Sequence, residues 1–88
     1  MNIGWDEKKY AINLKNHKVT FEEAASVLND PLALSALNDH PDGDRFQYIG
    51  ESVNSRILYV VTVEKNHGEI QIISARKATK NEIKKYQS

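Results

Sequence analysis

The feature that most constrains the fold is a strand-length segment that is apolar on both faces and bounded by short turns. Residues 56–63 are rich in β-branched and aromatic side chains. Such a segment is typical of a strand at the centre of a sheet. The turn Asn54-Ser55 precedes it and the turn Asn66-His67-Gly68 follows it. Connections as short as these join strands that run antiparallel. We therefore predict antiparallel strands on both sides of it, at residues 45–50 and 69–75.

Capping signals predict helices before and after these strands. Asp6 is a good N-cap for a helix that ends at about His17. Thr20-Phe21-Glu22-Glu23 is a capping box, in which the Thr20 hydroxyl accepts from the Glu23 N–H and the Glu23 carboxylate accepts from the Thr20 N–H. It begins a second helix that ends at about Leu28. A further capping box, Thr79 to Glu82, begins a basic C-terminal helix.

The expected architecture is a single α+β domain over residues 1–88. A chain of 88 residues has a thin core and room for one domain. Residues 32–37 are expected to add a fourth strand. The fold is then two N-terminal helices, an antiparallel four-stranded sheet with room for a short extra N-terminal strand, and a C-terminal helix.

A net charge of zero conceals an uneven distribution of charge along the chain. Residues 20–51 carry seven acidic side chains against Arg45 alone, whereas residues 76–88 carry five basic side chains against Glu82. A basic end is what binding to a polyanion requires. A solvated helix face gives the same pattern, so charge alone does not decide between the two.

Cysteine usage and hydropathy indicate a cytoplasmic location. The chain has no cysteine, which excludes disulfides and thiolate metal sites and fits a reducing cytosol. The first residues lack the basic and apolar parts of a signal peptide. No apolar run approaches the roughly 20 residues that span a bilayer, so no membrane partner is expected.

An acidic loop at residues 38–44 is the one segment that suggests a metal site. In an EF-hand alignment Asn38, His40, Asp42 and Gly43 fill positions one, three, five and six, but Ile49 stands where a bidentate Glu is required. We interpret the loop as a solvated turn and expect neither a metal nor a cofactor.

Residue types suited to metal-free RNA cleavage occur at the ends of the predicted strands. This reaction needs a base, cations for the phosphorane, and aromatic side chains that stack on bases. Each residue taken singly is equally explained as a charge at the rim of a small sheet. The candidates are Arg45, Tyr48, Arg56, Glu64, Lys65, Arg76 and Lys77.

Arg76 is the sharpest of these candidates, because a guanidinium holds two phosphate oxygens in a fork. We expect it to share a strand face with Ser74, Ile72 and Ile70. Arg45 and Arg76 are then catalytic cations with Glu64 as the base, while Tyr48, Arg56, Lys65 and Lys77 bind substrate. The alternative is that Arg76 pairs with an acid such as Glu64 or Asp44 and only holds the last helix in place.

Two further residues have simpler structural explanations. Trp5 lies beside a helix N-cap and is expected to anchor the core. His17 ends a helix, where its ring is expected to interact with the last carbonyls and the helix dipole.

The chain resembles the BrnT family of ribonuclease toxins over nearly its whole length. The resemblance rests on an N-terminal signature, a middle segment and a C-terminal signature, in the expected order. These are Trp5-Asp6-Glu7, Lys9, Asn13, Lys15, His17, Val19-Thr20-Phe21-Glu22-Glu23-Ala24, Asp30-Pro31, Arg45-Phe46, Ile49-Gly50, Ile72-Ile73-Ser74-Ala75-Arg76-Lys77-Ala78-Thr79, Glu82 and Tyr86.

This resemblance implies a RelE-like fold and a ribonuclease that blocks translation by cleaving RNA. It also implies a BrnA-type antitoxin with a ribbon-helix-helix domain, and binding of operator DNA only through the toxin–antitoxin complex. A partner-binding module that kept the fold and lost cleavage is the alternative.

Two positions depart from the family pattern. Gln71 stands where an Arg is expected before Ile72, and if that Arg contacts phosphate the substitution weakens activity. Lys18 stands where a helix-ending Gly is expected, and a non-Gly residue in the left-handed region costs roughly 1 kcal/mol.

Overall fold

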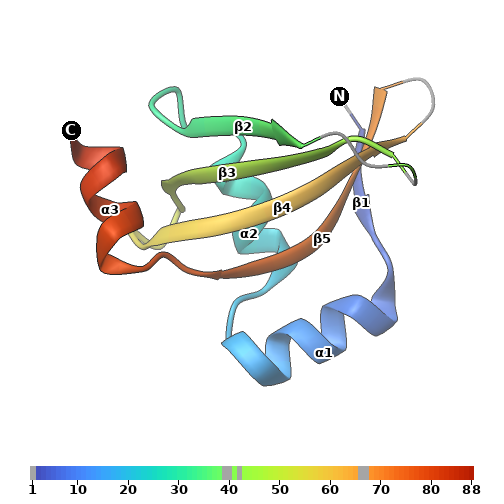
Figure 1. Cartoon of the computed structure of the whole chain (residues 1–88). Coiled ribbons are helices and arrows are strands. Elements are labelled where there is room, and N and C mark those ends of the chain that lie inside the picture. The colour runs from blue at the N-terminus through green and yellow to red at the C-terminus, as the bar shows by residue number, and fades with distance from the viewer. Residues whose placement is uncertain (1, 39–40, 42, 66–67) are drawn as a thin grey trace.

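Five strands and three helices make up the protein, seen in a computed structural model that describes residues 2–38, 41, 43–65 and 68–88 (Figure 1). The elements follow one another in the order β1 (Asn2–Trp5), α1 (Glu7–His17), α2 (Phe21–Val27), β2 (Leu34–Asn38), β3 (Arg45–Glu51), β4 (Ile57–Lys65), β5 (Glu69–Lys77) and α3 (Lys80–Gln87).

The strands form one mixed sheet in the order β1-β5-β4-β3-β2. Strands β2 to β5 are antiparallel, as the short turns predict, and β4 lies at the centre. β1 is the short extra N-terminal strand for which the prediction left room, but it lies parallel to β5, so the sheet is mixed and not purely antiparallel. The chain passes through α1 and the rest of the sheet before it returns to β5, so this pair needs no hairpin.

One face of the sheet is covered by α2, and the core lies between them. Side chains on this face alternate along β4, with Leu58, Val60 and Thr62 all fully buried. Phe21 and Val27 of α2 pack against them. Trp5 also packs against this core with its ring 5.9 Å from that of Phe21, as expected of an anchor.

The opposite face carries no helix across its middle and is called here the open face. Along β4 it is formed by Tyr59, Val61 and Val63, because successive side chains point to opposite sides of a strand. α1 lies along β5 beyond the end of β1, and α3 lies at the end of the sheet where β4 begins (Figure 1). No helix in the described part of the chain combines the length and hydropathy needed to cross a membrane.

A β-bulge in β5 changes which residues share the open face. Val61 pairs with Ser74, but the next residue Thr62 pairs with Ile72, so Ile73 is left without a partner on β4. Ser74 and Arg76 therefore lie on the open face, whereas Ile72 is fully buried in the core. The prediction that Ile72 shares a face with Arg76 is wrong for this reason.

The helix boundaries agree with the predicted caps, with one difference in how a cap is made. The Thr20 hydroxyl accepts from the Glu23 N–H as predicted. The Glu23 carboxylate does not return to Thr20, because Arg56 and Ser52 donate to it instead. The box at Thr79 and Glu82 is complete. The fourth predicted strand occupies Leu34–Asn38 instead of residues 32–37.

Candidate nucleic-acid interface

Three cations from three elements meet in one pocket at the far end of the open face. Arg45 begins β3 and is paired with Val63 of β4, and Lys65 lies two residues further on the same face. Lys9 reaches the pocket from the first turns of α1. The pocket has a volume of about 210 Å³, and Gln71 and Asp6 also line it.

The guanidinium of Arg45 is not fully satisfied in this pocket. Its Nε is buried and has no hydrogen-bond partner among the described residues. A buried donor of a charged group without a partner costs free energy, and such groups are usually paired in native proteins.

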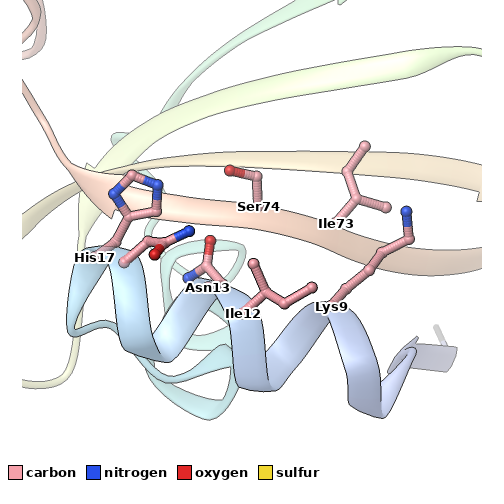
Figure 2. A pocket seen from close by; sticks show the side chains of 7 residues that line it. Lys9, Ile12, Asn13, His17, Ile73 and Ser74 are labelled. Carbon is pink, nitrogen blue, oxygen red and sulfur yellow. The ribbon is translucent and has the colours of Figure 1, made fainter.

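A second hollow adjoins this pocket and runs between α1 and β5 (Figure 2). Its volume is about 230 Å³. Lys9 and Ile73 line both hollows, which therefore adjoin, and the two together are called here the α1–β5 groove. Its other end is lined by Ser74 and by His17, the last residue of α1.

Asn13 fixes the position of α1 along this groove. Its side-chain Nδ2 donates to the Ala75 carbonyl at 2.9 Å, and its Oδ1 accepts from the Ala75 N–H at 3.1 Å. The side chain thus takes the place of a neighbouring strand where β1 has ended. Nδ2 also donates to the Val19 carbonyl, so the buried amide ties α1 to both β5 and the start of α2.

Arg76 lies on the open face at the other end of the sheet. Its two terminal nitrogens donate to the two carboxylate oxygens of Glu82, at 2.8 and 3.0 Å. Its guanidinium carbon also lies 4.1 Å from the centre of the Tyr59 ring. Arg76 therefore does pair with an acid, but with Glu82 of α3 and not with the predicted Glu64 or Asp44.

This ion pair changes the titration of both partners. The hydrogen bond from Arg76 lowers the pKa of Glu82 to about 2, with a smaller contribution from the Thr79 N–H. The same bond raises the pKa of Arg76. Both groups remain charged at neutral pH, and α3 is held to the sheet through them.

The remaining predicted residues do not join Arg45 and Arg76 on the open face. Tyr48 pairs with Val60 and packs against the core on the covered face. Glu64 lies between Val63 and Lys65, so its side chain points away from the pocket that these two line.

Arg56 and Lys77 lie near the end of the sheet where β4 begins. Arg56 is held by Glu23 of α2, and this hydrogen bond lowers the pKa of Glu23 to about 2. Lys77 is exposed and pairs with Leu58.

Sequence reasoning missed the part that α1 plays in the groove. Lys9, Ile12, Asn13, Asn16 and His17 all line it, at helical spacing i, i+3, i+4, i+7 and i+8. That spacing places them on one face of a helix. The signal is present in the sequence, but polar residues on a helix face are ordinarily solvated, so this spacing alone does not indicate a groove.

The described residues contain no cluster of three or more potential metal ligands. The acidic loop that suggested an EF-hand includes Asp39, His40 and Asp42, which lie outside the described residues.

Fold and site together define a small α+β protein with a cationic groove on the open face of its sheet. The sequence of residues 5–82 matches the model of a family described as the ribonuclease toxin BrnT of type II toxin–antitoxin systems. The chain therefore belongs to the BrnT toxin family.

The fold agrees with this assignment. The crystal structure of the Brucella abortus ribonuclease toxin BrnT matches with a TM-score of 0.67 and 24% sequence identity, over 91% of this chain and 99% of that chain. At this level of identity the match supports the fold. Comparison with curated protein sequences gave no match.

Proposed function

We propose that this chain is an endoribonuclease toxin that cleaves RNA without a metal ion in the cytoplasm and is neutralised by a BrnA-type antitoxin. The observation that carries the proposal is that Arg45, Lys65 and Lys9, from three different elements, line one pocket on the open face. Converging cations of this kind bind the phosphates of a nucleic-acid strand. In a member of a family described as ribonuclease toxins, the natural anion for the pocket is an RNA phosphate.

Arg45 and Lys65 bind the phosphate in this proposal, with Lys9 added from α1. Arg76 supplies a fourth cation on the same face. It pairs with Tyr59 of β4, whereas Arg45 pairs with Val63, four residues further along that strand. The roles first given to Tyr48, Arg56, Glu64 and Lys77 are not retained, since their side chains lie away from this groove.

A protein partner is supported by the leucines around β2. This edge strand is exposed along its whole length. Leu32, Leu34 and Leu37 have exposed fractions of 72%, 40% and 52%. Exposed apolar side chains on an edge strand are typical of a surface that another chain covers. We propose that the BrnA-type antitoxin covers it, and that operator DNA is bound only by the complex.

The test is RNA degradation by the purified protein in the presence of EDTA. Cleavage should persist, and Arg45→Ala and Lys65→Ala should each reduce it strongly. Lys8→Ala is the matched control, because Lys8 lies on α1 but lines neither hollow. Cleavage that EDTA abolishes contradicts metal independence, and full activity in both pocket variants contradicts the site.

A partner-binding module without cleavage is the second candidate. Two observations favour it: Gln71 lines the pocket where the family pattern has Arg, and the Arg76 guanidinium is occupied by Glu82. A protein that co-purifies with its antitoxin in moderate salt but leaves RNA intact would support this candidate.

A further inference from the structure

The base for the proposed cleavage has to be found on the open face, because Glu64 points to the other side of the sheet. Several acidic groups near the groove are already engaged. Asp6 accepts from the Lys9 N–H as a helix cap, and Glu82 is paired with Arg76. Glu69 accepts from the Gln71 side chain. None of these carboxylates lines the end of the groove beside Ser74.

Among the residues that the structure describes, His17 is the group in this hollow that can accept a proton near neutral pH. Its imidazole lines the α1–β5 groove and is exposed, and no hydrogen bond to it is found within the described residues (Figure 2). An imidazole that makes no hydrogen bond within the protein can form one with a substrate. The expected interaction with the last carbonyls is not found as a hydrogen bond among the described residues, while the position of His17 in the last turn of α1 agrees with the expected interaction with the helix dipole.

His17 and the phosphate pocket are connected through α1, because Lys9 of the same helix lines that pocket. Lys9 and His17 are eight residues apart on α1, so their Cα atoms are separated by about 12 Å along the axis. An RNA strand in the groove can therefore contact Lys9 with a phosphate and place a neighbouring ribose beside His17. Ile73 of β5, which has no partner residue on β4 because of the bulge, also lines the groove.

The electrostatic surroundings of His17 are simple. Lys9 is the other charged residue that lines this hollow, and β5 contributes only Ile73 and Ser74 to it. The charged groups nearest in the chain on α1 are Lys15 and Lys18, both exposed. On β5 the next charged residues are Arg76 and Lys77, and Arg76 is paired with Glu82.

We propose that His17 is the general base of RNA cleavage, which names the proton acceptor of the activity proposed above and rests on it. The neutral imidazole takes the proton of a ribose 2′-OH, and the 2′-oxygen forms a bond to the adjacent phosphorus. The bond from phosphorus to the 5′-oxygen breaks, and that oxygen takes a proton from water. The products are a 2′,3′-cyclic phosphate and a free 5′-hydroxyl.

The experiment compares wild type with His17→Gln, using Lys15→Ala as the matched control on the same helix. Single-turnover cleavage is measured across a pH series in EDTA. RNA affinity is measured with a substrate that lacks the attacking 2′-hydroxyl, and folding by thermal unfolding. His17→Gln should lower the cleavage rate by about 10²–10⁴-fold with unchanged affinity. The rise of the rate with pH, across the range in which imidazoles titrate, should disappear.

A second variant keeps the inference testable if the fold is affected. In His17→Ala, free imidazole added to the solution should restore part of the cleavage, which a structural role would not allow. Lys15→Ala should behave as wild type in every assay.

The outcomes separate the two proposals. A wild type that cleaves RNA, together with a His17→Gln variant of unchanged rate and pH profile, overturns the role of His17 alone. A variant that loses affinity but not rate does the same. A wild type that binds antitoxin and cleaves no RNA overturns the proposed function, and the base assignment with it.

Discussion

Lys18 occupies a backbone conformation that ordinarily favours glycine. Its φ and ψ are 59° and 32°, and its N–H donates to the Leu14 carbonyl as the cap of α1. The turn thus has the backbone conformation that a glycine would adopt, and Lys18 adopts it with the strain of a non-glycine residue. Lys18→Gly should raise the free energy of unfolding by about 0.5–1 kcal/mol, because glycine adopts this region without strain. Urea unfolding measures the change.

The control for this substitution lies three residues earlier. Lys15→Gly places glycine in the interior of the same helix and should destabilise the protein by about 1 kcal/mol. If both glycine variants lose stability, the left-handed cap is not strained.

Arg76 and Glu82 offer a matched pair of substitutions that separates catalysis from structure. Both Arg76→Ala and Glu82→Gln break the same ion pair, so both should lower the melting temperature. If Arg76 stabilises the phosphorane, only Arg76→Ala should slow RNA cleavage, by about 10²–10³-fold. Equal cleavage rates in the two variants would leave Arg76 with the role of fastening α3.

At the scale of elements, α1 depends on one buried amide. Asn13 satisfies both backbone groups of Ala75 and the carbonyl of Val19. Asn13→Ala should lower the free energy of unfolding by about 2–3 kcal/mol, since each buried group left without a partner costs about 1–3 kcal/mol. Asn16→Ala, an exposed neighbour, should change it by less than about 0.5 kcal/mol. Chemical denaturation distinguishes the two, and equal small effects would contradict the strand-like role of Asn13.

The elements were predictable where local signals decide them, and less so where distant contacts do. Caps at Asp6, Thr20 and Thr79 place the helices, because each depends on residues three positions away. β1 is only four residues long and pairs with β5, so nothing near it in the chain indicates its partner. The bulge at Ile73 is also a property of the pair β4–β5, which is why the alternation in β5 was misassigned.

The ion pair between α2 and the start of β4 should make stability depend on acid. The hydrogen bond from Arg56, followed by that from Ser52, lowers the pKa of Glu23 from its ordinary 4.5 to about 2. A folded-state pKa below the unfolded value means that the stabilisation is complete above about pH 4.5 and is lost as the pH falls towards 2.

Glu23→Gln should therefore flatten the fall in unfolding free energy over this range. Glu51→Gln, on the exposed end of β3, should follow the wild-type curve. The measurement is denaturant unfolding at a series of pH values, and parallel curves for Glu23→Gln and wild type would refute the assignment.

At the scale of the whole molecule the net charge is zero, but the pocket of the groove is lined by three cations against Asp6. Gln71→Arg places one more cation in the pocket with Arg45 and Lys65. RNA affinity should rise, and the slope of log affinity against log salt should steepen by about 0.7, the value for one additional single-strand phosphate contact. Asn29→Arg adds the same charge at the exposed end of α2 and should leave the slope unchanged.

The candidate site was only partly predictable, because some of its residues are brought together by elements that are distant in the chain. Arg45 and Lys65 belong to paired strands, so the hairpin between β3 and β4 brings them together. Lys9 and His17 join them through α1, whose place beside β5 depends on contacts across most of the chain. Composition and residue spacing do not indicate that α1 lies beside β5.

The contact between Asn13 and Ala75 spans 62 positions in the chain, so it cannot form until those residues have been synthesised. α1 leaves the ribosome before β5, which forms the other wall of the groove. A growing chain has therefore exposed its helix before any groove exists. In the function proposed above, RNA is not bound in the groove until β5 has been synthesised, and an antitoxin already present has that interval in which to bind the chain.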